Sequence, residues 1–245
     1  MPSLTVENYL KAILQLSLGT DADLVTTGQL ASSLGVSPGT VTSMLKTLAE
    51  GGLVQYRPYE GVSLSPSGHK LALRMIRRHR LLETFLVRTL SLTWDEVHEE
   101  AENLEHAVSD VLIDRIDDFL GHPTADPHGD PIPSANGLMR RQPQEGLPVT
   151  AWSSGATVRI IRVIDQSSEF LRYLAEQGCQ LDSIARIELN SREAGIVTLR
   201  LEDRLFSLGY PAAQQILAVE YGPDVPAPTA APRKRVAKAH RTPRS

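Results

Sequence analysis

Apolar positions recur at helical spacing near the start of the chain and predict two short helices. Residues 10–14 and 30–34 each place apolar side chains three and four positions apart, the spacing of one helix face. The second helix is expected to end at Gly35, because glycine accepts the backbone conformation of a helix-ending turn. Ser37 and Pro38 then supply a capping hydroxyl and a first-turn proline, which together predict the start of a third helix.

Two short strand-like runs follow the third helix. Residues 53–56 and 62–64 flank the segment 57–61, which contains proline and glycine, and this order predicts a β-hairpin. Two helices joined by a tight turn and followed by a hairpin are typical of a winged helix-turn-helix domain. We therefore predict such a domain over residues 1–68.

The middle of the chain is predicted to be helical. The serine-proline pair at 65–66 repeats the cap pattern and starts a helix that we expect to run to Leu90. A second long helix is expected from near Thr93 to Leu120, because acidic residues at its start suit the positive end of a helix dipole. We assign residues 69–140 to this helical domain, which ends in a loop rich in Pro, Gly and Asp.

Residues 147–221 contain three strand-like runs and are predicted to form a small β domain. The runs are 158–163, 184–189 and 196–201. A short helix is expected over residues 169–177, before a glycine. Residues 222–245 are Pro- and Ala-rich and then basic, so we expect a disordered tail. The expected fold class is mainly α with small β parts.

Composition favours a cytoplasmic protein. The single cysteine, Cys179, excludes a disulfide framework and a cysteine-based zinc finger. No run approaches the roughly 18 apolar residues of a membrane span, and residues 1–14 lack the pattern of a signal peptide. We therefore expect no membrane partner.

The net charge of −4 is unevenly distributed along the chain. Residues 233–245 hold six basic and no acidic residues, which leaves 19 basic against 29 acidic residues in the rest. Because so acidic a body is not typical of nucleic-acid binding, any DNA contact must rest on a local surface. The acidic excess has two open explanations, solubility and carboxylates clustered around a cation.

The third helix and the hairpin tip carry the candidate DNA contacts. Small hydroxyl side chains lie on the helix face opposite the apolar one, where they can approach phosphates or base edges in a major groove. The candidate residues are Ser37, Gly39, Thr40, Thr42, Ser43, Lys46, Arg57 and Tyr59. The alternative is a helix-turn-helix domain that binds only another protein.

Histidine and carboxylate residues concentrate in the helical domain. His79 and Glu83 are four positions apart and share a helix face. Four more ligand-type residues, at positions 98, 102, 105 and 106, fall within an arc of roughly 80–100° on the next helix. Packing of the two helices would bring His79 and Glu83 near His98 and turn the other three towards the first helix. The alternative is a solvated acidic helix with incidental histidines.

Known catalytic motifs are missing, so we expect that the chain is not an enzyme. The segment 98–102 lacks the second histidine of a zinc peptidase, and neither Glu102 nor Glu105 stands three residues before a histidine, as a di-iron bundle requires. No serine nucleophile elbow, phosphate-binding loop or dinucleotide-binding glycine pattern occurs.

Together, these features resemble the diphtheria toxin repressor family of metal-dependent bacterial transcription regulators. The resemblance covers the chain to about Glu220 and includes the winged helix and segments 78–83, 97–106 and 127–133. The pattern from His98 to His106 and the Pro-rich loop are its specific parts. It implies a helical dimerisation domain and a C-terminal SH3-like domain. It also implies a homodimer that binds a palindromic operator and controls metal-uptake genes, mainly as a repressor. A winged-helix regulator that senses an organic ligand remains the alternative.

The resemblance further implies two sets of metal ligands. The primary set comprises Asn8, Glu102, Glu105 and His106. The second set comprises His79, Glu83 and His98, to which the SH3-like domain would add Asp165, Gln166 and Glu169.

The resemblance also bears on which metal binds. Iron-responsive members have a cysteine where this chain has Glu102, whereas the manganese-responsive branch has a carboxylate. Mn(II) is therefore the expected effector, and Fe(II) is the alternative. Asn8 carries no charge, so Glu7 is a second candidate, although its neighbouring position on a helix directs it about 100° away. Lys11 stands where two-metal manganese proteins have a second carboxylate, which argues against that arrangement.

Overall fold

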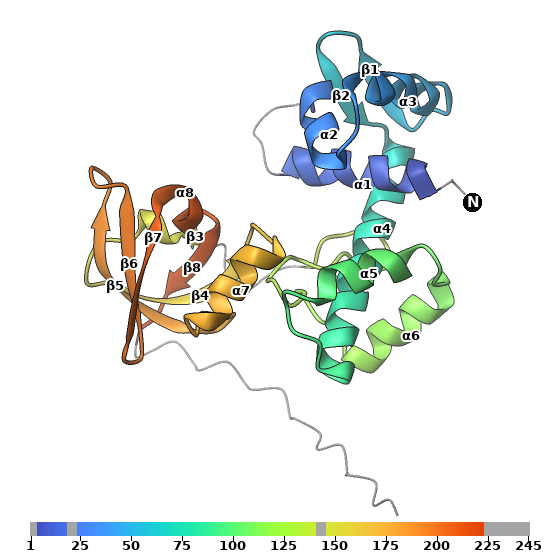
Figure 1. The fold of residues 1–245 in the computed structure, drawn as a ribbon. Coiled ribbons are helices and arrows are strands. Elements are labelled where there is room, and N and C mark those ends of the chain that lie inside the picture. The colour runs from blue at the N-terminus through green and yellow to red at the C-terminus, as the bar shows by residue number, and fades with distance from the viewer. Residues whose placement is uncertain (1–3, 19–23, 141–145, 223–245) are drawn as a thin grey trace, which may run out of the picture.

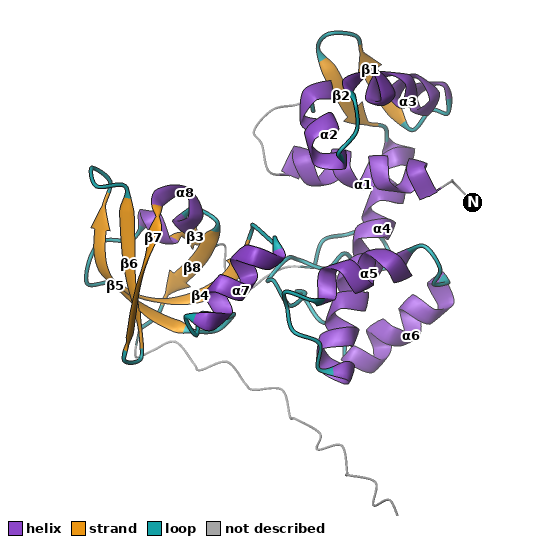
Figure 2. Cartoon of the chain, in the orientation of Figure 1, coloured by secondary structure: helices purple, strands orange, loops and turns teal. Residues whose placement is uncertain are grey.

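The computed structural model describes residues 4–18, 24–140 and 146–222, which form three units (Figure 1). Helices make up most of the first two units and strands most of the third (Figure 2). This arrangement confirms the predicted fold class. Across these ranges, no helical stretch has the length and hydropathy that crossing a lipid bilayer requires. The predicted disordered tail, residues 222–245, lies outside the described residues apart from Gly222.

The first unit has the three helices and the hairpin of a winged helix-turn-helix domain. Its elements are α1 (Leu4–Leu18), α2 (Thr27–Leu34), α3 (Pro38–Glu50), β1 (Val54–Arg57) and β2 (Gly61–Leu64). The turn between α2 and α3 has the local causes that the sequence predicts. Gly35 has a positive φ of 64°, and the Ser37 side chain accepts a hydrogen bond from the Thr40 amide. Buried apolar residues of α1, α2 and α3 form one core with the hairpin.

The helical unit differs from the prediction at one point. Its elements are α4 (Pro66–Phe85), a π-helical turn (Leu86–Leu90), α5 (Val97–Glu105) and α6 (Asp110–Leu120). The single helix predicted from Thr93 to Leu120 is wrong, because the chain breaks between α5 and α6. Ser109 accounts for the break, since its side chain accepts a hydrogen bond from the Leu112 amide and caps a new helix.

Helix α4 joins the first two units. It begins directly after the hairpin and continues into the helical unit, where α5 and α6 pack against it (Figure 1). The first helix, α1, also packs against α4. Side chains of α1 and α5 therefore meet beside α4.

The third unit is an antiparallel sheet with the strand order β3-β8-β4-β5-β6-β7. The strands are β3 (Leu147–Pro148), β4 (Thr157–Val163), β5 (Ile184–Ser191), β6 (Ile196–Leu201), β7 (Arg204–Gly209) and β8 (Ile216–Glu220). A 3₁₀ turn (Val149–Ala151) and the helices α7 (Ser168–Glu176) and α8 (Tyr210–Ala213) complete it. Strands β4, β5 and β6 and helix α7 were predicted from the sequence, whereas the other strands of this unit and α8 were not.

A loop between α6 and β3 connects the helical and β units. Gly129 has a φ of +88°, and a Cβ atom there would lie 2.1 Å from the Ile161 carbonyl oxygen of β4, so only glycine fits this close approach. The Val163 amide donates to the His128 carbonyl at 2.9 Å, and Arg162 forms an ion pair with Asp130. The β unit therefore rests on this loop.

Asp117 of α6 ties the loop to the helical unit. Arg77 donates to its Oδ2 at 2.9 Å and Arg140 to its Oδ1 at 2.8 Å. Burial alone would raise the pKa of Asp117, but the hydrogen bonds and charge of Arg140, with the charge of Arg77, lower it below its ordinary value.

Asp117→Asn should lower the free energy of unfolding by about 3 kcal/mol at pH 7, because it removes the carboxylate of Arg140 and leaves Arg77 with only the exposed Asp114. The pKa of Asp117 is lower in the folded chain than in the unfolded chain. Its stabilisation is therefore fully present above the pKa of the unfolded chain and is lost as the pH falls through the pKa of the folded chain. The difference from wild type, measured by urea unfolding in EDTA, should therefore shrink between pH 5 and pH 3. The exposed neighbour Asp118→Asn serves as the control. An equal deficit at both pH values would contradict this account.

Candidate metal centre

Side chains from three helices meet in a mostly buried cluster of imidazole, carboxylate and ammonium groups. Helix α4 contributes two members, α1 contributes one, and α5 contributes the others, which lie three or four residues apart on one face. The members are Lys11, His79, Glu83, His98, Glu102 and Glu105.

His79 lies at the centre of the cluster. Its Nε2 is 3.0 Å from Glu83 Oε1 and 3.1 Å from His98 Nδ1. Its Nδ1 is 2.7 Å from Glu105 Oε2. A single imidazole therefore contacts members of both predicted ligand sets.

The buried carboxylates need positive partners. Glu83 and Glu105 are both completely buried, and an unpaired charge there would be strongly destabilising. Burial raises the pKa of Glu83, but the charge of His79 and hydrogen bonds outweigh it and hold that pKa well below its ordinary value. Burial lowers the pKa of His79, but the charge of Glu83 and the hydrogen bonds that the imidazole donates to Glu105 and Glu83 raise it to about 9. The cluster therefore has the electrostatics of a cation site.

Lys11 supplies a cation from the chain itself. Its Nζ donates to Glu102 Oε1 at 2.7 Å and to Glu105 Oε2 at 2.9 Å, and it lies 3.2 Å from His79 Nδ1. Lys11 was expected only to disfavour a two-metal site, and these contacts were not predicted. The available signal was its position, four residues after Glu7 on the same face of a helix.

Both first-helix candidates lie beside the primary set. The Oε2 atom of Glu7 is 2.9 Å from His106 Nδ1, and His106 Nε2 is 3.5 Å from Glu105 Oε1. The expectation that Glu7 points away is therefore wrong, because its long side chain reaches His106 from the adjacent helical position. Asn8 Oδ1 is buried and has no hydrogen-bond partner, so this oxygen is available to coordinate a cation.

Three groups of ligand-type residues have atoms within 4.8 Å of one another among the described residues. The groups are His79–Glu83–His98, His79–Glu102–Glu105 and Glu83–Asp126–His128. The first is the predicted second set, and the next joins His79 to part of the primary set. The last was not predicted as a site, although segment 127–133 drew attention in the sequence.

The three candidate ligands of the β unit, Asp165, Gln166 and Glu169, differ in exposure and in their hydrogen-bond partners. Gln166 Nε2 donates to Asp130 Oδ2 at 3.1 Å and so reaches the loop beside the cluster. Asp165 is exposed and accepts a hydrogen bond from the Ser167 amide, and Glu169 is exposed in the first turn of α7. Neither Asp165 nor Glu169 belongs to any of the three groups found in the described part of the chain.

The candidate DNA contacts lie on α3, at its N-cap and on the hairpin. Seven are exposed, and Thr42 is half-buried, with its hydroxyl donating to the Pro38 carbonyl. The exposed ones are Ser37, Gly39, Thr40, Ser43, Lys46, Arg57 and Tyr59. Tyr59 is fully exposed at the hairpin tip and has a φ of 68°, which places a large aromatic group in solvent on a strained turn.

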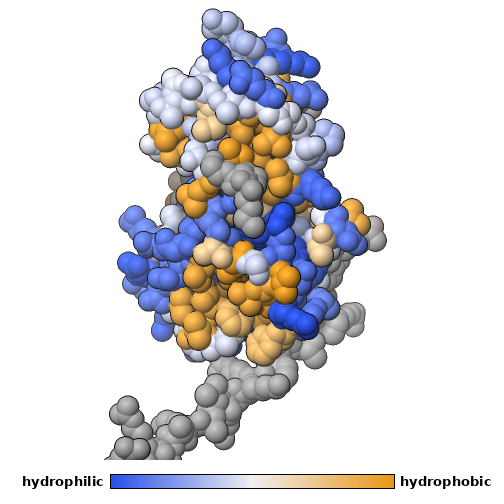
Figure 3. All heavy atoms as spheres, turned by 90° about the vertical axis from the view of Figure 1, so that its right-hand side faces the viewer, coloured by the Kyte–Doolittle hydropathy of each residue, from blue (hydrophilic) through white to orange (hydrophobic). Residues whose placement is uncertain are grey.

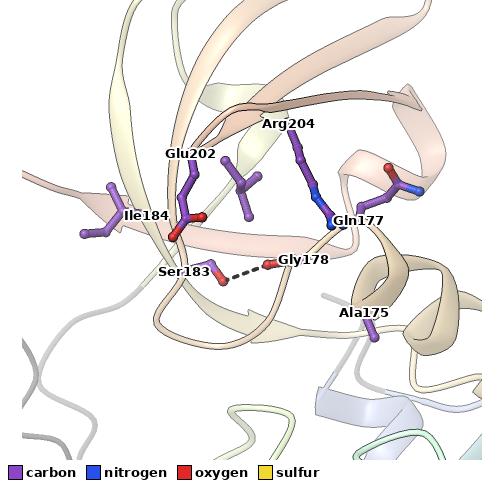
Figure 4. A pocket seen from close by; sticks show the side chains of 8 residues that line it. Ala175, Gln177, Gly178, Ser183, Ile184, Glu202 and Arg204 are labelled. Atoms are coloured by element: carbon purple, nitrogen blue, oxygen red, sulfur yellow. Dashed lines mark hydrogen bonds between the residues drawn. The ribbon is translucent and has the colours of Figure 1, made fainter.

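The β unit contains a hollow of about 430 Å³ near the end of α7 (Figure 4). Glu202 and Arg204 line it, and the Ser183 hydroxyl donates to the Gly178 carbonyl at its edge. None of its lining residues, all of which are described, has a buried polar atom without a partner. The hollow therefore does not support the alternative of an organic-ligand sensor.

Family comparisons connect these units to metal-dependent repressors. The iron dependent repressor N-terminal DNA binding domain matches residues 1–62, and the iron dependent repressor metal binding and dimerisation domain matches residues 65–134. The FeoA domain matches residues 147–220. The DNA-binding and metal-binding descriptions thus fall on the two units that α4 joins.

The chain is also similar to individual repressors. It is 30% identical over 182 residues to the diphtheria toxin repressor of Corynebacterium efficiens, covering 73% of this chain and 77% of that protein. It is 34% identical over 120 residues to the HTH-type transcriptional regulator MntR of Lysinibacillus sphaericus, covering 49% of this chain and 84% of MntR. A solved structure of a manganese-dependent transcriptional repressor in complex with manganese is 43% identical, with a TM-score of 0.79, and covers 88% of this chain and 100% of its own.

Lys11→Met keeps the aliphatic stem and removes the ammonium group. A divalent ion would then no longer compete with Lys11 for Glu102 and Glu105, so we expect Mn(II) affinity to rise about tenfold, which is about 1.4 kcal/mol. The metal-free protein should unfold at a lower temperature, because Glu105 loses a buried cationic partner. Calorimetric titration and thermal unfolding in EDTA measure the two effects, with the exposed Lys70→Met as control. Weaker Mn(II) binding would show that Lys11 supports the site rather than competing for it.

Proposed function

Because this chain belongs to the diphtheria toxin repressor family of metal-dependent DNA-binding repressors, we propose that Mn(II) is the ion that controls it. The family consists of transcriptional repressors, which confirms the prediction that the chain is not an enzyme. The similarity to a manganese-dependent repressor at 43% identity supports Mn(II). Fe(II) is the alternative effector, since the matching domains are described as those of iron dependent repressors.

The donor atoms also support Mn(II). Glu102, Glu105 and His106 offer oxygen and nitrogen, which are the ligands that hard divalent ions prefer. The one thiol of the chain, Cys179, is buried in the core of the β unit and takes no part. We assign these three residues to the primary site, completed from α1 by Glu7 and the unpartnered Oδ1 of Asn8.

The second site comprises His79, Glu83 and His98, whose ligand atoms already lie close together. Gln166 of the β unit donates a hydrogen bond to Asp130 in the loop beside this set. Asp165 and Glu169 would join only if α7 approached the cluster.

The single observation that carries the function is the contact between α1 and α5. Lys11 and Glu7 lie in the DNA-binding unit, whereas Glu105 and His106 lie in the helical unit. A bound ion supplies the positive charge that neutralises the α5 carboxylates and ties α1 to them. The cluster residues therefore set the position of the DNA-binding unit, and the ion raises DNA affinity by favouring the DNA-competent arrangement.

We further propose that the chain acts as a homodimer. Helix α6 exposes the large apolar side chains of Val111 (71%), Phe119 (70%) and Leu112. Leu104 of α5 is also exposed. Apolar side chains gather over this part of the helical unit in Figure 3. A second copy would cover this patch, consistent with the dimerisation domain that matches residues 65–134. Two α3 helices could then enter half-sites of a palindromic operator.

Glu105→Gln should abolish Mn(II)-dependent DNA binding, because it removes a charged ligand while keeping the side-chain volume. We expect Mn(II) affinity to fall about 100-fold or more, with circular dichroism unchanged. Calorimetry gives the metal affinity, and fluorescence anisotropy with a duplex selected from a random pool gives the DNA affinity. Glu99→Gln, exposed on α5, is the matched control. Parallel titrations with Fe(II) under anaerobic conditions test the alternative effector. A metal-dependent response equal to wild type would refute the assignment of Glu105.

Lys46→Ala should weaken operator binding and reduce the salt dependence by about one counterion, because Lys46 is an exposed cation on α3. Anisotropy at several salt concentrations gives the slope of log affinity against log salt. Arg192→Ala removes an exposed cation from the β unit and should leave the slope unchanged. An unchanged slope for Lys46→Ala would show that Lys46 does not contact a DNA phosphate.

Phe119→Glu should produce a monomer, because it places a charge in the centre of the proposed interface. Light scattering coupled to size exclusion measures the mass. Leu205→Glu, an exposed apolar position on β7, should leave the dimer intact. A dimer that persists in Phe119→Glu would place the interface elsewhere.

A further inference from the structure

The turn at the tip of the β1–β2 hairpin holds an aromatic residue in a backbone conformation that most side chains avoid. Tyr59 has a φ of 68°, in the left-handed region that Gly and Asn accept most readily. The Glu60 amide donates to the Arg57 carbonyl at 3.1 Å across the turn, and the ring of Pro58 permits only a negative φ. This combination matches a type II turn, whose third residue needs a positive φ. Tyr59 therefore occupies a position that favours glycine.

Nothing in the fold offsets the strain at Tyr59. Its side chain is fully exposed, so the ring contributes no burial to the core of the first unit. Residues held in unfavourable backbone conformations cluster where a ligand or partner uses them. A strained aromatic residue without a packing role therefore indicates a contact made outside the chain.

The base of the hairpin is fixed to the rest of its unit. Val25 and Val62 exchange two backbone hydrogen bonds of 2.9 Å, and both side chains are buried. Gly61 lies against the same segment, since a Cβ atom there would be 2.7 Å from the Val25 carbonyl oxygen. Helix α3 packs against β1 (Figure 1). The support that presents Tyr59 is therefore the same one that carries the candidate recognition helix.

The charged residues at the tip neutralise each other. Arg57 Nη1 lies 3.4 Å from Glu60 Oε2, and both side chains are exposed. A DNA phosphate that approached the tip would meet a cation and an anion side by side, so its net attraction would be small. The apolar face of the Tyr59 ring is therefore the feature of this tip that is available for a contact.

We propose that Tyr59 inserts its ring into the minor groove beside the major groove that α3 enters, and packs there against deoxyribose and base edges. Operator DNA is the partner, so this role rests on the proposed function. The tip lies within residues 1–62, which match a DNA binding domain. Other DNA-binding domains place a second element in the minor groove next to a helix in the major groove, and apolar side chains can serve as wedges there. An apolar contact adds affinity without releasing counterions.

Tyr59→Asn separates this role from a structural one, because asparagine accepts a positive φ and lacks the ring. In Mn(II) we expect about tenfold weaker binding to the selected duplex, because the apolar contact is lost, with an unchanged slope of log affinity against log salt. The unfolding temperature in EDTA should be at least that of wild type. Tyr59→Phe should bind as wild type does. Leu205→Asn, which removes an exposed apolar side chain from the β unit, is the matched control.

Two results of the anisotropy titrations would overturn the role of Tyr59. Wild-type affinity in Tyr59→Asn would show that the ring does not contact DNA and would leave a protein partner as its use. A slope reduced by about one counterion would show that the tip contacts a phosphate instead.

Hydroxyl-radical footprinting locates the contact, because the radical cleaves DNA by attacking deoxyribose. Wild type should protect sugars across a minor groove next to each half-site, and Tyr59→Asn should lose this protection while keeping the rest of the footprint. Identical footprints would refute the proposed position of Tyr59. Comparison of wild type with and without Mn(II) tests the proposed function separately. A wild-type footprint that does not respond to Mn(II) would refute metal control, whereas protection lost only in Tyr59→Asn would still support the minor-groove contact.

Discussion

Two completely buried carboxylates, Glu83 and Glu105, impose the main constraint on this molecule. A buried negative charge must have a cation close by, and here His79 contacts both groups while Lys11 contacts Glu105. These partners lie on α1, α4 and α5. The arrangement of the three helices therefore depends on how the charge of the two carboxylates is balanced.

That dependence is the physical basis for the proposal that a metal ion acts at this cluster. Helix α1 belongs to the DNA-binding unit and α5 to the helical unit, and their contact runs through charged side chains rather than an apolar core. Charged contacts respond to an added ion, whereas apolar packing does not. Lys11 contacts Glu102 and Glu105 of α5, so in the proposed function metal binding would exchange one cation for another of higher charge.

Local sequence signals predicted much of the fold and which candidate ligands share a helix face. Gly35, Ser37 and Pro38 determine the turn into α3 by their own backbone and capping preferences, without help from distant residues. His98, Glu102 and Glu105 likewise share one face of α5 because they lie three or four positions apart on a helix. Such features can be predicted from the sequence because their causes lie within a few neighbouring residues.

The remaining features depend on contacts between distant segments. Lys11 meets Glu105 across 94 positions, and Glu7 meets His106 across 99, so neither contact follows from periodicity. The grouping of Glu83 with His128 depends on a loop folding back onto α4. The break before α6 has a local cause, the Ser109 cap, which the prediction of one long helix did not take into account.

The most direct test of the central claim compares DNA binding by the same preparation with and without metal. The protein is demetallated with EDTA, dialysed, and titrated into a selected duplex by fluorescence anisotropy, before and after addition of Mn(II). The account predicts at least about a tenfold gain in affinity, which is about 1.4 kcal/mol of coupling between the ion and DNA. Equal affinity in both states would contradict the claim that a cation between α1 and α5 controls DNA binding.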